Sequence, residues 1–426
     1  MAMQVSHMAE NLIGSEIIRI AGEIKAKIRQ GEKIFNLTIG DFNPSLFPIP
    51  TAYRDEIIAA YNAGITNYPS ANGMQELREA ISGFIARRQG LEYDANDILV
   101  SSGARPIIFA TYMAILDPGD KVIYPLPSWN NNHYTHITSS KHIIVETNPE
   151  SNFMLTADMI RPHIQEANMI ALCSPLNPTG TVFPKDQLAG ICELVLEENK
   201  RRGDSQKPLY VLYDQIYWNL TYNGTVHHDP VSLYPEMRKY TVFVDGMSKA
   251  FAATGVRVGW TMGPSYVIQK MRSILSHAGA WSPKAEQMAT AAYLNKAEEV
   301  DQFLEGMREK LYARLDGFYK GFQSLKAKGH KIDAIAPQAA IYLTVKLDLV
   351  GMVTEGGTVL QTSDQVRKYL LDEASLALVP FYAFGAARNS PWFRLSVGTA
   401  RIEDIPTVIS NVDRALSKLK VGEVSA

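Results

Sequence analysis

One lysine and one arginine stand close together in a stretch of small and hydroxylated residues. Lys249 and Arg257 follow an apolar, β-branched run, residues 240–244, that is typical of a buried strand. A lysine that is partly desolvated at a strand end has a lowered pKa and becomes an amine able to form a Schiff base. The planar guanidinium of Arg257 suits a bidentate contact with a phosphate. Taken alone, the pair is explained more simply by a surface turn and a salt bridge.

Other polar or flat side chains occupy the same position after further strand candidates. Gly103 follows residues 98–102, Trp129 follows 121–124, Asn177 follows 169–173 and Asp214 follows 209–213. Each has an ordinary interpretation of its own, a tight turn for Gly103 and a core position for Trp129. In α/β sheets, however, ligands lie beyond the carboxyl ends of the strands, and this shared position indicates one common site.

The elements that must position these residues alternate between strand and helix, which predicts an α/β fold with a mostly parallel sheet. After a long helical region the chain mixes strands and helices, which suggests a smaller α+β domain. We predict an N-terminal arm and part of the small domain at 1–50, a large domain at 51–299 and a small domain at 300–426. The predicted helices are 14–30, 55–63, 74–88, 107–116, 156–166, 184–202 and 285–328, and the further strands are 34–39, 141–146, 341–345, 376–379 and 393–397.

Composition narrows the class of protein. The chain has 426 residues, 46% of them hydrophobic, and a formal charge of −2, which gives no basic footprint for nucleic acid or a membrane surface. The two cysteines, Cys173 and Cys192, fit a reducing compartment and stand at no metal-ligand spacing, so we expect no metal site. No apolar run approaches the roughly 18 residues of a membrane span, and we expect a cytoplasmic protein.

Two residues outside the strand-end series also suit ligand binding. Arg394 lies in an apolar strand context, where an unpaired cation is costly, so it should have a carboxylate partner. That partner is either a bound ligand or an acidic side chain of the small domain, and the sequence leaves both open. Gly40 begins a Gly-Asp-Phe-Asn-Pro loop that suits a close backbone approach or an ordinary turn.

The ordered set Asn177, Asp214, Tyr217, Lys249, Arg257 and Arg394 resembles the class I/II aminotransferases, which are fold-type I enzymes dependent on pyridoxal 5′-phosphate. The resemblance runs from about residue 40 to residue 398. Its most specific parts are Ser-Lys-Ala-Phe-Ala-x-Thr-Gly-x-Arg-x-Gly-Trp at 248–260, Asn-Pro-Thr-Gly at 177–180 and Phe-Arg-Leu-Ser at 393–396. It implies a large domain with a mostly parallel seven-stranded sheet flanked by helices, and a smaller α+β domain built from both termini.

The resemblance also implies roles for the cofactor-binding residues. Lys249 would hold the cofactor as a Schiff base and then carry a proton between substrate and cofactor. Asp214 would pair with the pyridinium nitrogen, so that the ring accepts electrons. Asn177 and Tyr217 would hydrogen-bond the ring oxygen, and Trp129 would stack on the ring. The phosphate would be held by Gly103, Ala104, Arg105, Ser248 and Arg257.

Further roles concern the substrate and the partner subunit. Arg394 would bind the substrate α-carboxylate, assisted by the Gly40 backbone and close to Asn177 and Trp129. Tyr68 would reach the phosphate of a neighbouring subunit, which makes a homodimer with shared active sites the expected working unit.

The chain departs from the family pattern at four places. Gln215 replaces a frequent glutamate, and Gly246 replaces a frequent hydroxyl residue near the phosphate. Ala104 and Arg105 stand where small or hydroxylated residues are common, and residues 337–342 replace a frequent Gly-x-Phe near the expected substrate side chain.

The expected reaction is amino transfer between an L-amino acid (aspartate, glutamate or an aromatic one) and a 2-oxo acid. The alternative on the same scaffold is a lyase, for example one that carries out β-elimination at a carbon–sulfur bond. A non-catalytic ligand sensor is disfavoured, because the catalytic set is complete. Arg105 or Arg388 could bind a second substrate carboxylate, whereas the aromatic residues Phe42, Trp129, Tyr382 and Phe384 would suit a larger apolar substrate.

Overall fold

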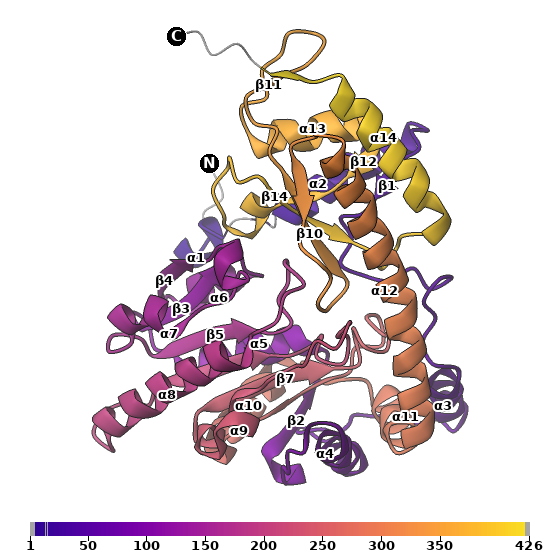
Figure 1. The fold of residues 1–426 in the computed structure, drawn as a ribbon. Helices are drawn as coiled ribbons and strands as arrows, with labels where there is room; N and C mark the ends of the chain where they lie inside the picture. The colour runs from indigo at the N-terminus through magenta and orange to yellow at the C-terminus, as the bar shows by residue number, and fades with distance from the viewer. Residues whose placement is uncertain (1–4, 13, 15, 422–426) are drawn as a thin grey trace.

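The computed structural model describes residues 5–12, 14 and 16–421 of the chain. Two main sheets organise it, one of seven strands and one of four, and they lie one above the other in Figure 1. Two pairs of short strands complete the β structure. The larger sheet and its helices account for most of the middle of the chain, and the smaller sheet is built from the last third.

The seven-stranded sheet has the strand order β2-β8-β7-β6-β5-β3-β4. Strands β7, β6, β5, β3 and β4 are mutually parallel, and β8 runs antiparallel to both of its neighbours. The mostly parallel seven-stranded sheet expected from the resemblance is therefore confirmed. Its strands are β2 (Ile98–Ser101), β3 (Lys121–Leu126), β4 (Lys141–Glu146), β5 (Met169–Cys173), β6 (Tyr210–Asp214), β7 (Thr241–Gly246) and β8 (Gly259–Met262).

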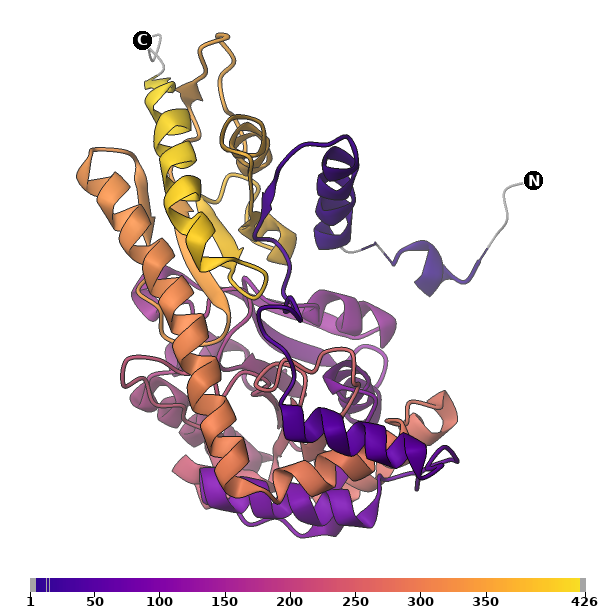
Figure 2. The same cartoon turned by 90° about the vertical axis from the view of Figure 1, so that its right-hand side faces the viewer.

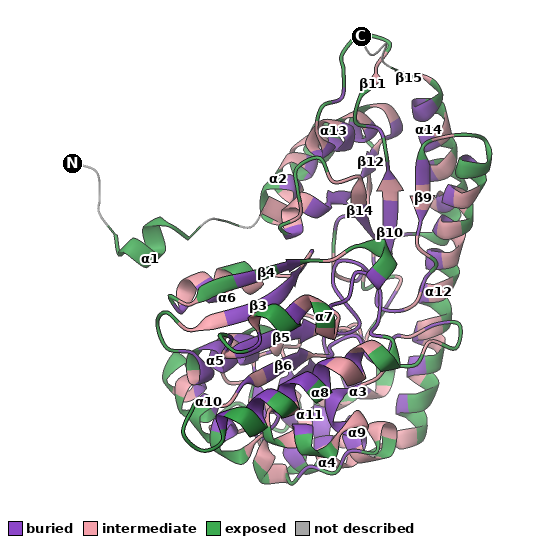
Figure 3. Ribbon diagram, turned by 60° about the vertical axis from the view of Figure 1, so that its left-hand side comes forward, coloured by how far each residue is buried: buried purple, intermediate pink, exposed green. Residues whose placement is uncertain are grey.

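Helices cover both faces of this sheet because alternate side chains of its strands are apolar in both directions. In β6, Val211 and Tyr213 face one core with α4 and α8, whereas Leu212 faces a second core with α5 and α10. Figure 3 shows buried residues along the strands and exposed residues on the outer helix surfaces. The helices are α3 (Thr51–Asn62), α4 (Gln75–Gln89), α5 (Ala104–Ile115), α6 (Asn131–Ile137), α7 (Ala157–Ile160), α8 (Lys185–Arg202), α9 (Pro230–Leu233), α10 (Ser265–Ala278) and α11 (Lys284–Leu294).

The four-stranded sheet has the order β13-β14-β10-β9 and carries Arg394 on β14. An N-terminal strand joins this part of the molecule, since Phe35 of β1 pairs in parallel with Leu376 of β12. The elements are α1 (His7–Glu10), α2 (Glu16–Arg29), β1 (Phe35–Asn36), α12 (Ala297–Ala327), β9 (Ile332–Ala334), β10 (Tyr342–Leu347), β11 (Met352–Val353), α13 (Ser363–Ala374), β12 (Leu376–Ala377), β13 (Val379–Pro380), β14 (Trp392–Ser396), α14 (Ile405–Ser417) and β15 (Lys420–Val421).

One predicted helix, 285–328, is in fact two. α11 ends at Leu294 and α12 begins at Ala297, and the chain turns at Asn295 and Lys296 between them. Both segments are apolar at helical spacing, so the pattern does not mark the turn. Figure 2 shows α12 running alongside both parts of the molecule, whereas α11 lies across its lower end.

Several other sequence predictions were wrong in extent. The predicted strand 34–39 pairs over Phe35–Asn36 only, and the predicted helix 156–166 is the short α7 followed by a 3₁₀ turn at Arg161–His163. The expected single strand 376–379 is two, β12 and β13, in different sheets. Strand β8 was not predicted, because its residues belong to the conspicuous stretch that carries Lys249.

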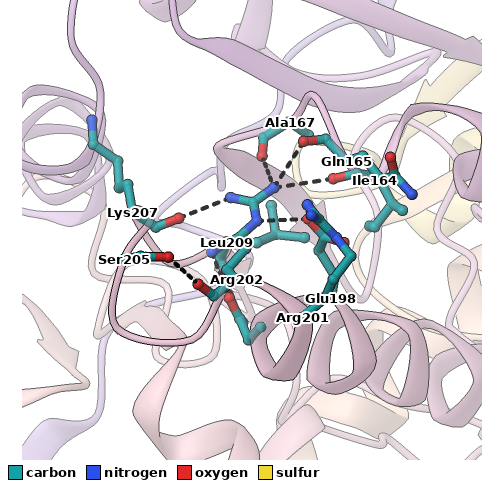
Figure 4. Close-up of polar contacts among 10 residues, drawn as sticks. Ile164, Gln165, Ala167, Glu198, Arg201, Arg202, Ser205, Lys207 and Leu209 are labelled. Atoms are coloured by element: carbon teal, nitrogen blue, oxygen red, sulfur yellow. Dashed lines mark hydrogen bonds and ion pairs between the residues drawn. The ribbon is translucent and has the colours of Figure 1, made fainter.

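A buried ion pair fastens the end of α8 beneath the sheet. Arg202 donates to Glu198 and to the carbonyls of Ile164, Gln165, Ala167 and Lys207 (Figure 4). Arg202 is 5% exposed and Glu198 4%. The cation is thus compensated by a carboxylate and by backbone dipoles, as burial of a charge requires.

Among the residues that the structure describes, no helix is both long and apolar enough to cross a membrane. The same residues contain no group of three or more histidine, cysteine or acidic side chains that could hold a metal ion. The domain limits at 50 and 299 and the cytoplasmic location remain predictions.

Candidate active site

A cavity of about 390 Å³ opens at the carboxyl edge of the seven-stranded sheet. The loops that follow β2, β3, β5, β6 and β7 all reach it, as expected for a mostly parallel sheet. Most of the predicted site residues line this cavity: Gly40, Ala104, Arg105, Trp129, Asn177, Asp214, Tyr217, Ser248, Lys249, Arg257 and Arg394. The shared position inferred from the sequence therefore corresponds to one place in space.

Lys249 lies in the loop after β7 and points into the cavity. Its Nζ donates to the carbonyl oxygen of Gly40 at 2.7 Å. Burial lowers the pKa of Lys249 to about 8, and the nearby Asp41 carboxylate acts in the opposite direction. No ion pair of Lys249 occurs within the described part of the chain. The amine is therefore closer to its nucleophilic, neutral form than an ordinary lysine.

Asp214 ends β6 and is half-buried on the cavity wall. One carboxylate oxygen accepts a hydrogen bond from the backbone N–H of Ile216 at 3.0 Å. Burial raises the pKa of Asp214 to about 6, which the N–H bond and Lys249 partly offset. A carboxylate in this environment gains from a cationic hydrogen-bond donor, because such a donor compensates the lost hydration.

A cationic pocket lies where β2 passes into α5. Gly103 caps α5 with φ +93°, and a Cβ there would lie 2.0 Å from Arg257 Nη2. Arg257 donates to the carbonyls of Thr254 and Ser102 at 2.6 and 2.8 Å. The free N–H groups of α5 and the guanidinium meet in one place. That arrangement suits a phosphate.

Three glycines explain why no hydroxyl residue stands at position 246. A Cβ on Gly246 would lie 2.8 Å from Gly259 Cα, and one on Gly259 would lie 2.5 Å from the Gly103 carbonyl carbon. The strands β7 and β8 and the start of α5 therefore approach each other at backbone distance. The departure from the family pattern at Gly246 follows from this packing.

Arg394 is 2% exposed, yet it has no carboxylate partner among the described residues. It donates to Asn177 Oδ1 at 2.9 Å and to the Thr38 carbonyl at 2.7 Å, and its Nε has no partner. The structural salt bridge considered from the sequence is thus absent in this part of the chain. A buried, uncompensated guanidinium that faces a cavity favours an anionic ligand.

Two aromatic contacts shape the cavity walls. The Tyr217 hydroxyl lies 2.6 Å from that of Tyr342 on β10. Trp129 faces Arg105, whose guanidinium carbon lies 5.1 Å from the indole ring. Trp129 is half-buried: it lines the cavity and also packs against the aromatic cluster that contains Phe384.

Some predicted residues lie outside the cavity. Gly103 packs against the guanidinium of Arg257, and Tyr68 is 82% exposed beside Trp281. Arg388 stacks on Tyr382 and does not line the cavity, and the Tyr382 hydroxyl donates to Asp364. Of the two candidates for a second substrate cation, only Arg105 is in place.

Sequence reasoning missed several cavity residues. Asp41 accepts a hydrogen bond from Thr254 at 2.6 Å, and both line the cavity. Tyr342 belongs to residues 337–342, which depart from the family pattern, but no sequence spacing predicts its contact with Tyr217. Ile17 and Ile18 of α2 also line the cavity, and no sequence pattern separates them from the other apolar residues of that helix.

Comparisons with known proteins agree with this geometry. A model of the family described as "Aminotransferase class I and II" matches residues 32–410. An aspartate aminotransferase of Rhizobium meliloti (strain 1021) is 31% identical over 91% of this chain and 90% of its own. A bifunctional aspartate and glutamate/aspartate-prephenate aminotransferase of Petunia hybrida is 30% identical over 95% of this chain and 81% of its own.

Solved structures give the same result. A Rhizobium meliloti aspartate aminotransferase has a TM-score of 0.90 at 29% identity and covers 98% of this chain and 100% of its own. An aspartate aminotransferase from Thermus thermophilus, solved with maleate, has a TM-score of 0.86 at 27% identity and covers 97% and 100%. With the family model spanning residues 32–410 and the lysine, aspartate and arginines in place, the chain belongs to the class I and II aminotransferase family and is a transaminase.

Proposed function

We propose that the cavity binds pyridoxal 5′-phosphate and transfers an amino group from a dicarboxylic L-amino acid to a 2-oxo acid. The observation that carries the proposal is the arrangement of Lys249, Asp214 and Arg257 around one cavity. An amine with a lowered pKa, a half-buried carboxylate and a cationic helix N-terminus match the aldehyde, the ring nitrogen and the phosphate of that cofactor. The close packing of Arg257 against Gly103, where a Cβ would lie 2.0 Å from Nη2, holds the guanidinium beside the start of α5 and supports the fit.

The cofactor, when bound, supplies an electron sink for the bond that breaks at the substrate Cα. Asp214 would accept a hydrogen bond from the ring nitrogen and keep it protonated. Arg257, Ser248 and the N–H groups of α5 would hold the phosphate. Asn177 and Tyr217 would donate to the ring oxygen, and Trp129 would stack on the ring.

Lys249 would also transfer a proton during the reaction. Its amine, held by the Gly40 carbonyl, would remove the proton from the substrate Cα and return it one atom away on the cofactor side. Arg394 would fix the substrate α-carboxylate and so place the Cα–H bond toward Lys249. Strand-end loops, Tyr342 of β10 and Arg394 of β14 line the cavity around this position.

A dicarboxylic substrate is supported by the two arginines of the cavity. Arg394 lies in the buried interior and Arg105 is exposed at the wall near Trp129. A substrate with one carboxylate at each end could contact both. The names of the relatives, which include aspartate and glutamate/aspartate-prephenate aminotransferases, and the maleate in the Thermus structure support the same choice.

A homodimer is proposed as the working unit. Tyr68 and Trp281 lie together at a second hollow that also includes Pro69 and Pro283, and Tyr68 is 82% exposed. A second copy that covers this aromatic surface would bring Tyr68 to the phosphate pocket of its partner. Sedimentation of Tyr68→Phe and wild-type protein, with cofactor affinity measured on both, tests the assignment.

A half-reaction tests the reaction itself. The cofactor-loaded protein is mixed with L-aspartate and no 2-oxo acid. We expect one equivalent of oxaloacetate per site, conversion of the cofactor to its amine form, and recovery on addition of 2-oxoglutarate. In a second reaction with an S-alkyl-L-cysteine and no acceptor, continuous release of the thiol, pyruvate and ammonia would instead establish the lyase alternative. A parallel screen of amino donors, including phenylalanine, tests the dicarboxylic preference.

A further inference from the structure

The hydroxyl of Tyr342 is held in a narrow place at the floor of the cavity. It lies 2.6 Å from the Tyr217 hydroxyl, although the two residues are 125 positions apart. On its other side is Gly40, where a Cβ would lie only 2.8 Å from the same oxygen. Tyr342 is 2% exposed and begins β10, which pairs with β14 through Ser396. Its position is therefore fixed by the sheet and by close packing.

The number of donors at this contact limits the direction of the hydrogen bond between the two hydroxyls. A tyrosine hydroxyl donates one hydrogen bond and accepts up to two. Within the described residues, Tyr217 is the hydrogen-bond partner of the Tyr342 hydroxyl, and no other acceptor is available to it. If Tyr217 donates its proton to a ligand in the cavity, the bond between the two hydroxyls has only one direction left. Tyr342 must then donate to Tyr217.

We propose that Tyr342 is a positioning residue that aims the Tyr217 proton at the cofactor's ring oxygen. This inference rests on the proposed function. Donation from Tyr342 removes the alternative in which Tyr217 points toward β10. It also polarises the Tyr217 hydroxyl, because hydrogen bonds in a chain strengthen one another. Tyr342 also lines the cavity, and its ring centre lies 4.6 Å from the Arg394 guanidinium carbon, a contact that a phenylalanine ring would keep. The hydroxyl, by contrast, acts through Tyr217.

The test is a pH titration of the visible absorbance of the cofactor-loaded enzyme. The cofactor's ring oxygen shares a proton with its linkage to Lys249. When that proton leaves, the donors Tyr217 and Asn177 stabilise the negative oxygen, so a weaker Tyr217 bond raises the pH midpoint. Tyr342→Phe keeps the ring and removes the hydroxyl. We expect its midpoint to rise by about 0.5–1 pH unit, the equivalent of one hydrogen bond. The KM for aspartate should stay unchanged while kcat falls.

Two further variants give the test its specificity. Tyr217→Phe should raise the midpoint at least as far, and the double variant should rise no further than Tyr217→Phe alone, because Tyr342 acts only through Tyr217. Tyr222→Phe is the matched control. The Tyr222 hydroxyl is buried and donates to the carbonyl of Ala340, just before β10, at 2.5 Å, but Tyr222 does not line the cavity. Its midpoint should equal that of the wild type.

An unshifted midpoint in Tyr342→Phe, with a shifted one in Tyr217→Phe, would overturn the inference and leave the proposed function intact. Additive shifts in the double variant would also overturn it, since they would mean independent action. Absence of any lysine-bound cofactor absorbance in the wild type would instead overturn the proposed function.

Discussion

Two buried arginines show how differently this fold treats the same side chain. Arg202 and Arg394 are 5% and 2% exposed. Arg202 donates to a carboxylate and to four backbone carbonyls (Figure 4), whereas Arg394 donates to one amide oxygen and one carbonyl and leaves its Nε unpaired. The first charge is compensated within the chain. The second has no carboxylate partner among the described residues, and under the proposed function an anion in the cavity would supply it. Incomplete pairing of a buried cation thus distinguishes the proposed site from the framework.

The same contrast applies to lysines. Lys207 pairs with Asp117 and Asp120, and its pKa is raised against the effect of burial. Lys249 has no such pair within the described residues, and burial lowers its pKa to about 8. Without a carboxylate partner, burial thus lowers the pKa of a lysine, whereas two such partners raise it.

The largest effect on stability is expected at the compensated arginine. Arg202→Gln removes the guanidinium. The buried carboxylate of Glu198 then loses its buried cationic partner, and several backbone carbonyls lose their hydrogen-bond donor. We expect the free energy of unfolding to fall by about 3–5 kcal/mol, measured by denaturant titration. The kcat/KM of the folded fraction should be unchanged.

Arg201→Gln is the control for that prediction. Arg201 contacts the same carboxylate, but its side chain is 44% exposed. Its loss should cost less than about 1 kcal/mol. Equal losses in the two variants would remove the distinction between a buried and an exposed partner of Glu198.

The opposite pattern is expected at Arg394. Arg394→Gln should lower kcat/KM for aspartate by the equivalent of about 2–5 kcal/mol, chiefly through a higher KM, because a buried charge pair with the substrate is lost. The free energy of unfolding should not fall, since no carboxylate of the described chain loses a partner. Loss of cofactor affinity at unchanged KM would assign Arg394 to the cofactor instead.

The pH dependence of cofactor uptake tests the Lys249 environment. Only the neutral amine attacks the aldehyde, so the rate of uptake by the cofactor-free protein should rise with pH and level off above the lysine pKa. Because burial lowers that pKa, we expect the midpoint near pH 8. Asp41→Asn should move it lower, because the Asp41 carboxylate favours the charged amine. A rate still rising steeply at pH 10 would mean that Lys249 behaves as an exposed lysine.

The smallest effect on kcat/KM is expected at Arg105, which is exposed and therefore screened by solvent. Arg105→Gln should lower kcat/KM for aspartate about tenfold, or about 1.4 kcal/mol, and leave phenylalanine turnover unchanged. Similar losses for both substrates would point to a phosphate-binding role for Arg105, as the family resemblance first implied.

Much of the site was predictable because it depends on local patterns. Apolar runs of strand length, each followed by a polar or flat residue, indicated a parallel sheet with its ligands at one edge. Lys249, Asp214 and Asn177 are at that edge. The motif around Lys249 also implied a role for Arg257. The structure shows that Arg257 packs against Gly103.

What the sequence could not predict depends on contacts between distant segments. β8 lies between β2 and β7, which no local period indicates. The stacked glycines 246, 259 and 103 and the contact between Tyr217 and Tyr342 arise from sheet packing over long separations. The turn between α11 and α12 interrupts no apolar pattern. Tyr68 does not line the cavity of its own chain, and its proposed contact with a second subunit involves residues that a single chain does not contain.

The most direct test of the central claim is to locate the bound cofactor. The protein is loaded with pyridoxal 5′-phosphate, reduced with borohydride to fix the cofactor on whichever lysine holds it, and mapped by peptide mass spectrometry. We predict one cofactor per chain on the peptide that contains Lys249, and none in Lys249→Ala. A cofactor fixed on Lys207 or another lysine, or no labelling at all, would contradict the assignment of this cavity as the active site.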